Sequence, residues 1–164
     1  WRVKAHVSND GNRAVTQYLD LVRRELEETN VSIILGILLI DMGKFITARN
    51  YFKDLIEQTP EDNYEDQAAL YYNLGLTYDF EGGLDDAEVS FLQAIEYLRQ
   101  LPQKRRNMVR TYNALGHVFH VNGELQEAID WYKRAESIGD IDDIVQAQTY
   151  THMAQYHFTK ELFP

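Results

Sequence analysis

Residues 71–94 read YYNLGLTYDFEGGLDDAEVSFLQA, and residues 112–135 read YNALGHVFHVNGELQEAIDWYKRA. The two stretches align without a gap, with a Leu-Gly pair, a second Gly, an Ala and an aromatic residue at matching positions. A less regular copy surrounds Gly36, so that Gly36, Gly75 and Gly116 lie 39 and 41 residues apart. A period near 40 residues, carried by helix-forming residues, predicts helical hairpins that stack side by side instead of one central core.

The glycines of this repeat fall into two groups with different physical roles. One group stands in the middle of an expected helix, where Gly costs about 1 kcal/mol relative to Ala: Gly36, Gly75 and Gly116. Its recurrence predicts that a neighbouring helix passes too close to leave room for a side chain. The other group stands where the chain reverses and can adopt a positive φ: Gly43, Gly82 or Gly83, and Gly123.

Small and aromatic residues recur on the second helix of each hairpin. The small contacts are expected at Ala48, Ala87 and Ala128. Four residues further on, on the same helical face, stand the aromatic residues Phe52, Phe91 and Tyr132, which we expect to fill the gap toward the next helix.

Composition bounds the classes of function. The 164 residues suffice for one domain, and 45% of them are hydrophobic, which argues against disorder. The absence of cysteine excludes disulfides and thiolate chemistry, and it fits a reducing compartment, so we expect a cytoplasmic protein. The longest apolar run, residues 31–40, is too short to span a bilayer. A formal net charge of −10 argues against nucleic acid and anionic membranes and favours neutral or basic partners.

The chain divides into an N-terminal part, residues 1–29, and a repeat array, residues 30–164. Residues 1–7 alternate apolar and polar and read as a short strand, whereas residues 13–29 carry the helical spacing of a capping helix. We expect full repeats at about 30–60, 65–102 and 107–139, followed by a final helix at 142–160. The basic stretch Lys104-Arg105-Arg106 between two repeats reads as a solvated turn, with a local acidic contact as the alternative.

The residues of the second and third units resemble the tetratricopeptide repeat. The second unit carries that pattern at Tyr71, Leu74, Gly75, Tyr78, Gly82, Ala87, Phe91 and Ala94, and the third at Tyr112, Leu115, Gly116, Phe119, Gly123, Ala128, Tyr132 and Ala135. The first departs from it with Ser32, Leu39 and Leu55. The long units are similar in style to kinesin light chains. Similar arrays also follow mono-ADP-ribosyltransferase domains. Residues 1–7 resemble the last strand of such a domain.

The resemblance implies an all-α superhelix, in which the first helices of the hairpins line a concave groove that binds a peptide or a partner helix. The function that follows is a non-catalytic scaffold for protein–protein interaction, without cofactor or metal, whose partner is neutral to basic with apolar anchors. The groove residues that the resemblance implies are Tyr72, Asn73, Leu76, Asp79 and Phe80 from the second unit, Arg110, Asn113, His117, His120 and Val121 from the third, and Gln148, Thr151, Gln155 and Phe158 from the last helix.

Several alternatives stay open at this point. Ile33, Ile37 and Ile40 either line the groove with Asp41 or pack against the capping helix at 13–29. The whole array is either a scaffold in its own right, a regulatory or targeting appendage of a larger enzyme such as an ADP-ribosyltransferase, or a self-association module that dimerises weakly through Tyr150, Met153, Ala154 and Phe158.

The sequence offers little support for a carboxylate clamp, a metal site or a catalytic motif. The carboxylate clamp by which some relatives hold chaperone tails needs Lys and Asn on the first groove helix, where Ile33 and Ile37 stand instead. His117 and His120 share a helical face that His152 could approach, but groove histidines are more often hydrogen-bonding groups or pH-sensitive groups than metal ligands. No phosphate loop, nucleophile elbow or paired-histidine zinc helix occurs.

Overall fold

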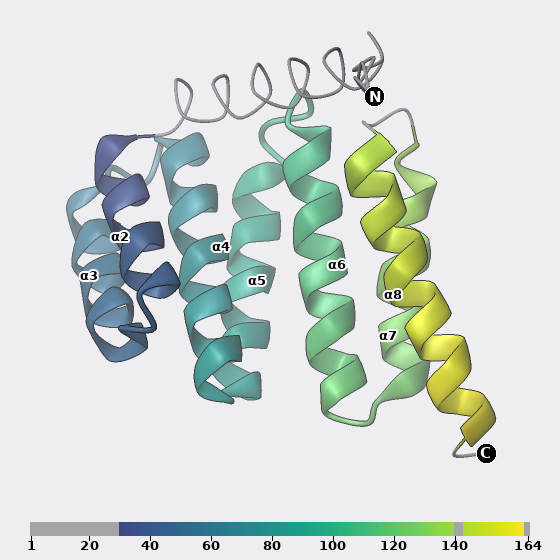
Figure 1. Ribbon diagram of the computed structural model, residues 1–164. Coiled ribbons are helices and arrows are strands. Elements are labelled where there is room, and N and C mark those ends of the chain that lie inside the picture. Colours follow the sequence, from purple (N-terminus) through teal and green to yellow (C-terminus); the bar gives the residue numbers. More distant parts are fainter. Residues whose placement is uncertain (1–29, 140–142, 163–164) are drawn as a thin grey trace, which may run out of the picture.

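The computed structural model describes residues 30–139 and 143–162, which fold into helices throughout (Figure 1). The helices of this part are α2 (Val31–Asp41), α3 (Phe45–Gln58), α4 (Tyr64–Glu81), α5 (Leu84–Leu98), α6 (Arg105–Val121), α7 (Leu125–Ser137) and α8 (Asp143–Leu162). The prediction of an all-α repeat superhelix is therefore confirmed. The expected strand at residues 1–7 and capping helix at 13–29 lie outside the described residues, so the division of the chain at residue 30 stays a prediction.

The helices form two rows. Each helix contacts the next one along the chain, so that α2–α3, α4–α5 and α6–α7 are hairpins and α8 packs beside the last of them. The first helices of neighbouring hairpins also contact one another, α2 with α4, α4 with α6, and α6 with α8. In Figure 1 these first helices make up the front row, and α3, α5 and α7 stand behind it. Side chains of α4, α6 and α8 can therefore act together on one side of the array.

The repeated mid-helix glycines permit close packing within each hairpin. A Cβ atom on Gly75 would lie 2.6 Å from Cε1 of Phe91, well inside van der Waals contact. The same clash would arise between Gly36 and Phe52 and between Gly116 and Tyr132. The predicted close approach is confirmed. Each ring lies against the glycine of its own hairpin, because the second helix crosses the first at that glycine.

The turns follow the sequence expectation. Gly43, Gly82 and Gly123 have φ values of 69°, 78° and 84°, in the left-handed region that residues with a Cβ rarely adopt. The structure also decides between the two glycines of the second turn. Gly82 takes the left-handed conformation, whereas Gly83 has an ordinary φ of −83° and precedes α5.

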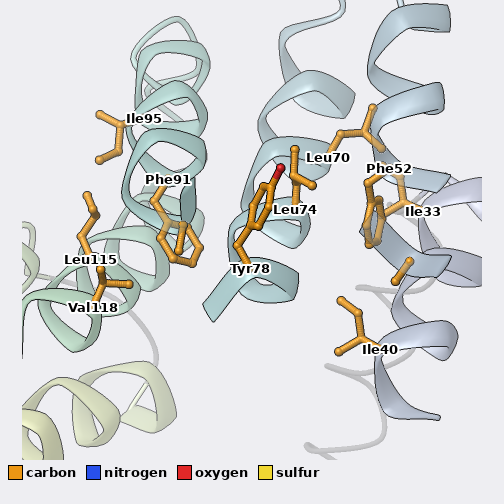
Figure 2. Packing of buried hydrophobic residues seen from close by; sticks show 12 residues of the cluster. Ile33, Ile40, Phe52, Leu70, Leu74, Tyr78, Phe91, Ile95, Leu115 and Val118 are labelled. Atoms are coloured by element: carbon orange, nitrogen blue, oxygen red, sulfur yellow. The ribbon is translucent and has the colours of Figure 1, made fainter. Parts of the chain in front are cut away.

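A continuous apolar core runs along the array between the two rows. Figure 2 shows it passing from Ile33 and Phe52 through Leu74 and Phe91 to Leu115. A smaller cluster around Tyr132 and Tyr156 of α8 continues it at the C-terminal end. Burial of this kind supplies most of the stability of a repeat array, because each unit covers its neighbour's apolar face.

Ile33 and Ile40 belong to this core, with 2% and 8% of their surfaces exposed. Of the two alternatives left open for these residues, lining the groove is therefore excluded for Ile33 and Ile40. They occupy the same core cluster as Phe52 and Leu74, because α2 turns its Gly36 side toward α3. Ile37 is half-buried against the same cluster.

The basic stretch between α5 and α6 forms specific contacts, contrary to its interpretation as a solvated turn. Nζ of Lys104 lies 2.7 Å from Oε1 of Glu65 at the start of α4. Nη2 of Arg105 donates to the carbonyl oxygens of Ile138 and Gly139 at the end of α7. Cations at a helix C-terminus satisfy carbonyls that have no partner within the helix. These contacts tie successive units together at one edge of the array.

Candidate binding face

The side chains that the sequence pointed to lie mostly along α4, α6 and α8, and most of them remain at least partly exposed. We call this set the first-helix face and define it as Tyr72, Leu76, Asp79, Phe80, Arg110, His117, His120, Val121, Gln148, Thr151, Gln155 and Phe158. Corresponding positions recur in successive units. Asp79 and His120 each follow their repeat glycine by four residues, and Phe80 and Val121 by five.

Two residues of the expected site, Asn73 and Asn113, are buried and bonded internally. Nδ2 of Asn73 donates to the carbonyl oxygen of Ala69, one turn earlier in α4, at 2.8 Å. Nδ2 of Asn113 donates to Oγ1 of Thr149 at 2.9 Å, which joins α6 to α8. Their amide NH2 groups are used within the fold, so we leave both residues out of the first-helix face.

Tyr72 forms the middle of a layered contact between α4, α5 and α6. Its ring packs at a tilt on the buried ring of Phe91, with centroids 5.7 Å apart. The guanidinium carbon of Arg110 lies 5.4 Å from the centroid of Tyr72, within the range of a cation–π interaction. The contact holds the Tyr72 ring in a fixed orientation, with part of its surface still open to solvent.

An acid–imidazole pair joins the middle of α4 and α6. Oδ2 of Asp79 lies 3.2 Å from Nδ1 of His117. The hydrogen bond to Asp79 raises the pKa of His117, and this effect exceeds the opposing influence of burial. The pair therefore favours the charged imidazole and connects two successive units across the face.

Two neighbouring histidines, His120 and His152, have lowered pKa values. Burial, followed by the charge of His117, lowers the pKa of His120 and also that of His152. Nε2 of His120 lies 3.0 Å from Oγ1 of Thr159 on α8. The ring of His152 stacks almost parallel on Tyr132, with centroids 5.4 Å apart. The imidazoles thus serve to attach α8 to the third hairpin.

Three apolar side chains stand out from the face near the C-terminal ends of the first helices. Phe80, Val121 and Phe158 are 58%, 57% and 65% exposed. Phe80 stacks on Phe45 of α3, with centroids 5.5 Å apart and planes inclined by 17°. The sequence reasoning did not include Phe45, and the only signal for it was its place directly after the turn at Gly43. Exposed aromatic and aliphatic groups beside half-buried polar ones are typical of surfaces that bind other chains.

The geometry offers no constellation for chemistry in the part of the chain that the structure describes. Within these residues no group of three or more His, Asp or Glu side chains is placed to hold a metal ion. What the face can supply is apolar area, one acid–imidazole pair, a cation over an aromatic ring and exposed amides and hydroxyls.

Stacked hairpins with an exposed first-helix face define the class of all-α helical-repeat proteins. Family models agree with this assignment and sharpen it. Two models, both described as tetratricopeptide repeat, match residues 27–100 and 109–138, which together make up well over half of the chain. The chain belongs to the tetratricopeptide repeat family. Repeats of this family generally mediate protein–protein interaction and are typically not catalytic. Among curated proteins, none matches this chain.

None of the helices in residues 30–139 and 143–162 is long and apolar enough to cross a bilayer.

Proposed function

We propose that this chain is a non-catalytic interaction module that binds a polypeptide across α4, α6 and α8. The observation that carries the proposal is the register of Phe80 and Val121. Both are well exposed, and they occupy equivalent positions on successive first helices. A partner laid across the helices would meet apolar anchoring sites at the spacing of the repeat, with the imidazoles and the Tyr72 ring beside them.

The charge of the chain indicates what the partner carries besides apolar anchors. The formal net charge is −10. On α5, burial raises the pKa of the Glu88 carboxyl, and the charges of Glu124, at the start of α7, and of Asp85 raise it further. A basic segment would relieve this repulsion, whereas an acidic segment would add to it. We therefore propose a neutral-to-basic partner with aromatic or aliphatic anchors.

A selection experiment with random peptides tests the proposal directly. A randomised peptide library is displayed on phage and selected against the full chain, and the winning peptides are synthesised and measured by calorimetry. We expect the selected peptides to carry Lys or Arg together with apolar anchors. Their affinity should fall at least about tenfold, or by about 1.4 kcal/mol, when Phe80 is replaced by Ala.

The chain provides a matched control for this experiment. Val89 is 60% exposed, like Phe80, but it lies on α5 in the second row. Val89→Ala should leave the affinity unchanged. The first-helix face would be rejected as the binding surface if the selected peptides bound the Phe80→Ala variant as well as the wild type. It would also be rejected if they lost affinity for the Val89→Ala variant.

Self-association is a second candidate function, and one observation favours it. Tyr150 and Phe158 of α8 are 48% and 65% exposed, and Ala154 between them is exposed as well, so the three form a stripe with a spacing of four residues. Met153, which the sequence reasoning added to this surface, packs inward against the Tyr132 cluster. Light scattering over a range of concentrations, with Tyr150→Asp as the variant, tests the idea. A monomer at all concentrations rejects it.

The remaining alternative, an appendage of a larger enzyme, depends on the strand-like residues 1–7. They lie outside the described residues, so this alternative stays a prediction from the sequence alone.

A further inference from the structure

Helix α2 is apolar on two opposite sides. Its inner side carries Ile33 and Ile40, which are buried in the core. Its outer side carries the residues Val31, Leu35, Leu38 and Met42, which are 79%, 51%, 51% and 63% exposed. Their spacings of four, three and four residues place them on a single stripe of the helix. Single exposed apolar residues are ordinary, but a continuous stripe of four marks a surface that another segment covers.

The sequence directly before α2 has a stripe with the same spacing. Val15, Leu19, Val22 and Leu26 also follow one another at four, three and four residues. At helical spacing, Arg13, Asp20, Arg24 and Glu27 fall on the side opposite this stripe, so that side is polar. Alternating spacings of four and three residues are the pattern with which two helices pack at a small crossing angle.

The two stripes match each other when the chain reverses between Glu28 and Thr29. Counted in residues from that point, each apolar residue of the first segment then has a partner in α2 at the same distance on the other side. The pairs are Leu26 with Val31, Val22 with Leu35, Leu19 with Leu38, and Val15 with Met42. All four pairs are in register with no residue left over, and both stripes have the same length.

The start of α2 agrees with a reversal at this place. Asn30 has φ −57° and ψ 130°, which is not helical, and its side-chain oxygen accepts a hydrogen bond from the backbone N–H of Ser32. Asn30 is therefore an N-cap, and α2 cannot continue backward through it as one straight helix.

We propose that residues 13–28 pack antiparallel along the outer stripe of α2, in the register of these four pairs, as an intramolecular cap on the array. The cap closes the N-terminal end of the solenoid, because an uncovered first helix would leave apolar area facing water. The outer side of α2 is then not a docking site for a second copy or for another protein. This inference is independent of the binding face proposed above.

The absence of native cysteine makes a direct test possible. Leu19→Cys/Leu38→Cys and Val15→Cys/Met42→Cys are two in-register pairs in the full chain, and Leu26→Cys/Leu38→Cys is the out-of-register control. The control closes the shortest loop, so in a chain without the cap it would form its disulfide fastest. In the proposed register its two positions are displaced by seven residues, roughly 10 Å along the helix, beyond the reach of a disulfide.

Each variant is oxidised under mild conditions, and the products are resolved by non-reducing electrophoresis and mass spectrometry, with circular dichroism as the check on folding. We expect both in-register pairs to form a bond within one chain about tenfold faster than the control. A control that closes as fast as either in-register pair, or an in-register pair that forms no bond, overturns the proposal. Bonds between two chains overturn it as well and assign the stripe to a second copy.

Discussion

The ring of Phe91 lies so close to the backbone of Gly75 that a Cβ atom there would come within 2.6 Å of the ring carbon Cε1. Phe91 is completely buried, so its ring has little room to withdraw. This contact explains why a residue that weakens helices recurs in the middle of α4. The loss of helix propensity is offset by the close crossing of α4 and α5 that the missing side chain permits.

The first prediction concerns this contact. Gly75→Ala improves helix propensity by about 1 kcal/mol, yet we expect a net destabilisation of about 1–2 kcal/mol, because overpacking a rigid core costs more. Urea denaturation followed by circular dichroism measures it. Gly83→Ala is the control, since a Cβ at Gly83 would lie at an ordinary 3.5 Å from Cδ1 of Tyr78.

A rescue variant sharpens the first prediction. Phe91→Leu in the Gly75→Ala background makes room for the new methyl group, so the two substitutions together should cost less than the sum of their separate effects. Strict additivity would mean that the Gly75–Phe91 contact does not determine the crossing of the two helices.

The second prediction concerns the bond between Asn113 and Thr149, which joins α6 to α8. Thr149→Val removes the acceptor and leaves the buried amide of Asn113 without it, so we expect a loss of about 1–3 kcal/mol. Asn113→Leu/Thr149→Val should recover part of that loss, because no polar group then remains unpaired. Thermal unfolding of the two single variants and the double variant gives the coupling. A coupling of zero would show that this bond does not hold α8 in place.

The third prediction concerns pH and the pair of Asp79 and His117. Because the folded pKa of His117 is raised, its stabilising contribution is fully present below the unfolded pKa of about 6.5 and is lost as the pH rises through the folded pKa. Asp79→Asn should therefore cost about 0.5 kcal/mol near pH 5.5 and close to nothing near pH 8.5, the small value reflecting a partly exposed pair.

The measurement for this prediction is urea denaturation at the two pH values, with Asp54→Asn, an exposed carboxylate on α3, as the control. The lowered pKa values of His120 and His152 act in the opposite direction and weaken the fold as the pH falls. They are present in both proteins, so they largely cancel in the difference. A larger effect of Asp79→Asn at the higher pH would contradict the assignment.

The fourth prediction concerns the salt dependence of partner binding. If the partner is basic, raising the ionic strength from about 0.05 M to about 0.5 M should weaken binding of the selected peptides several-fold, because screening shortens the reach of charge attraction. Fluorescence anisotropy with a labelled peptide measures this. Affinity that is independent of salt would remove the argument from net charge, while leaving the apolar anchors as the basis of binding.

Much of the fold was predictable from residues whose role is set by backbone geometry. Gly43, Gly82 and Gly123 mark turns because only Gly readily adopts their positive φ, and Gly75 marks a close crossing because nothing larger fits. Such constraints act on single positions and can be read from spacing alone.

The candidate site was less predictable, because it depends on which neighbour each side chain meets. Position within the repeat placed Asn73 and Asn113 on the same face as His117, but the hydrogen bonds to Ala69 and Thr149 take both amides into the interior. Ile33 and Ile40 lie in the core and not on the groove for a similar reason. The sequence of an apolar helix such as α2 does not show which of its sides faces the core.

The most direct test of the binding face is amide chemical-shift mapping of the full chain with a selected peptide. Our account predicts that the largest shift changes cluster in α4, α6 and α8, around Phe80, His117, Val121 and Gln155. Changes concentrated in α5 and α7, with α4 and α6 unperturbed, would contradict it.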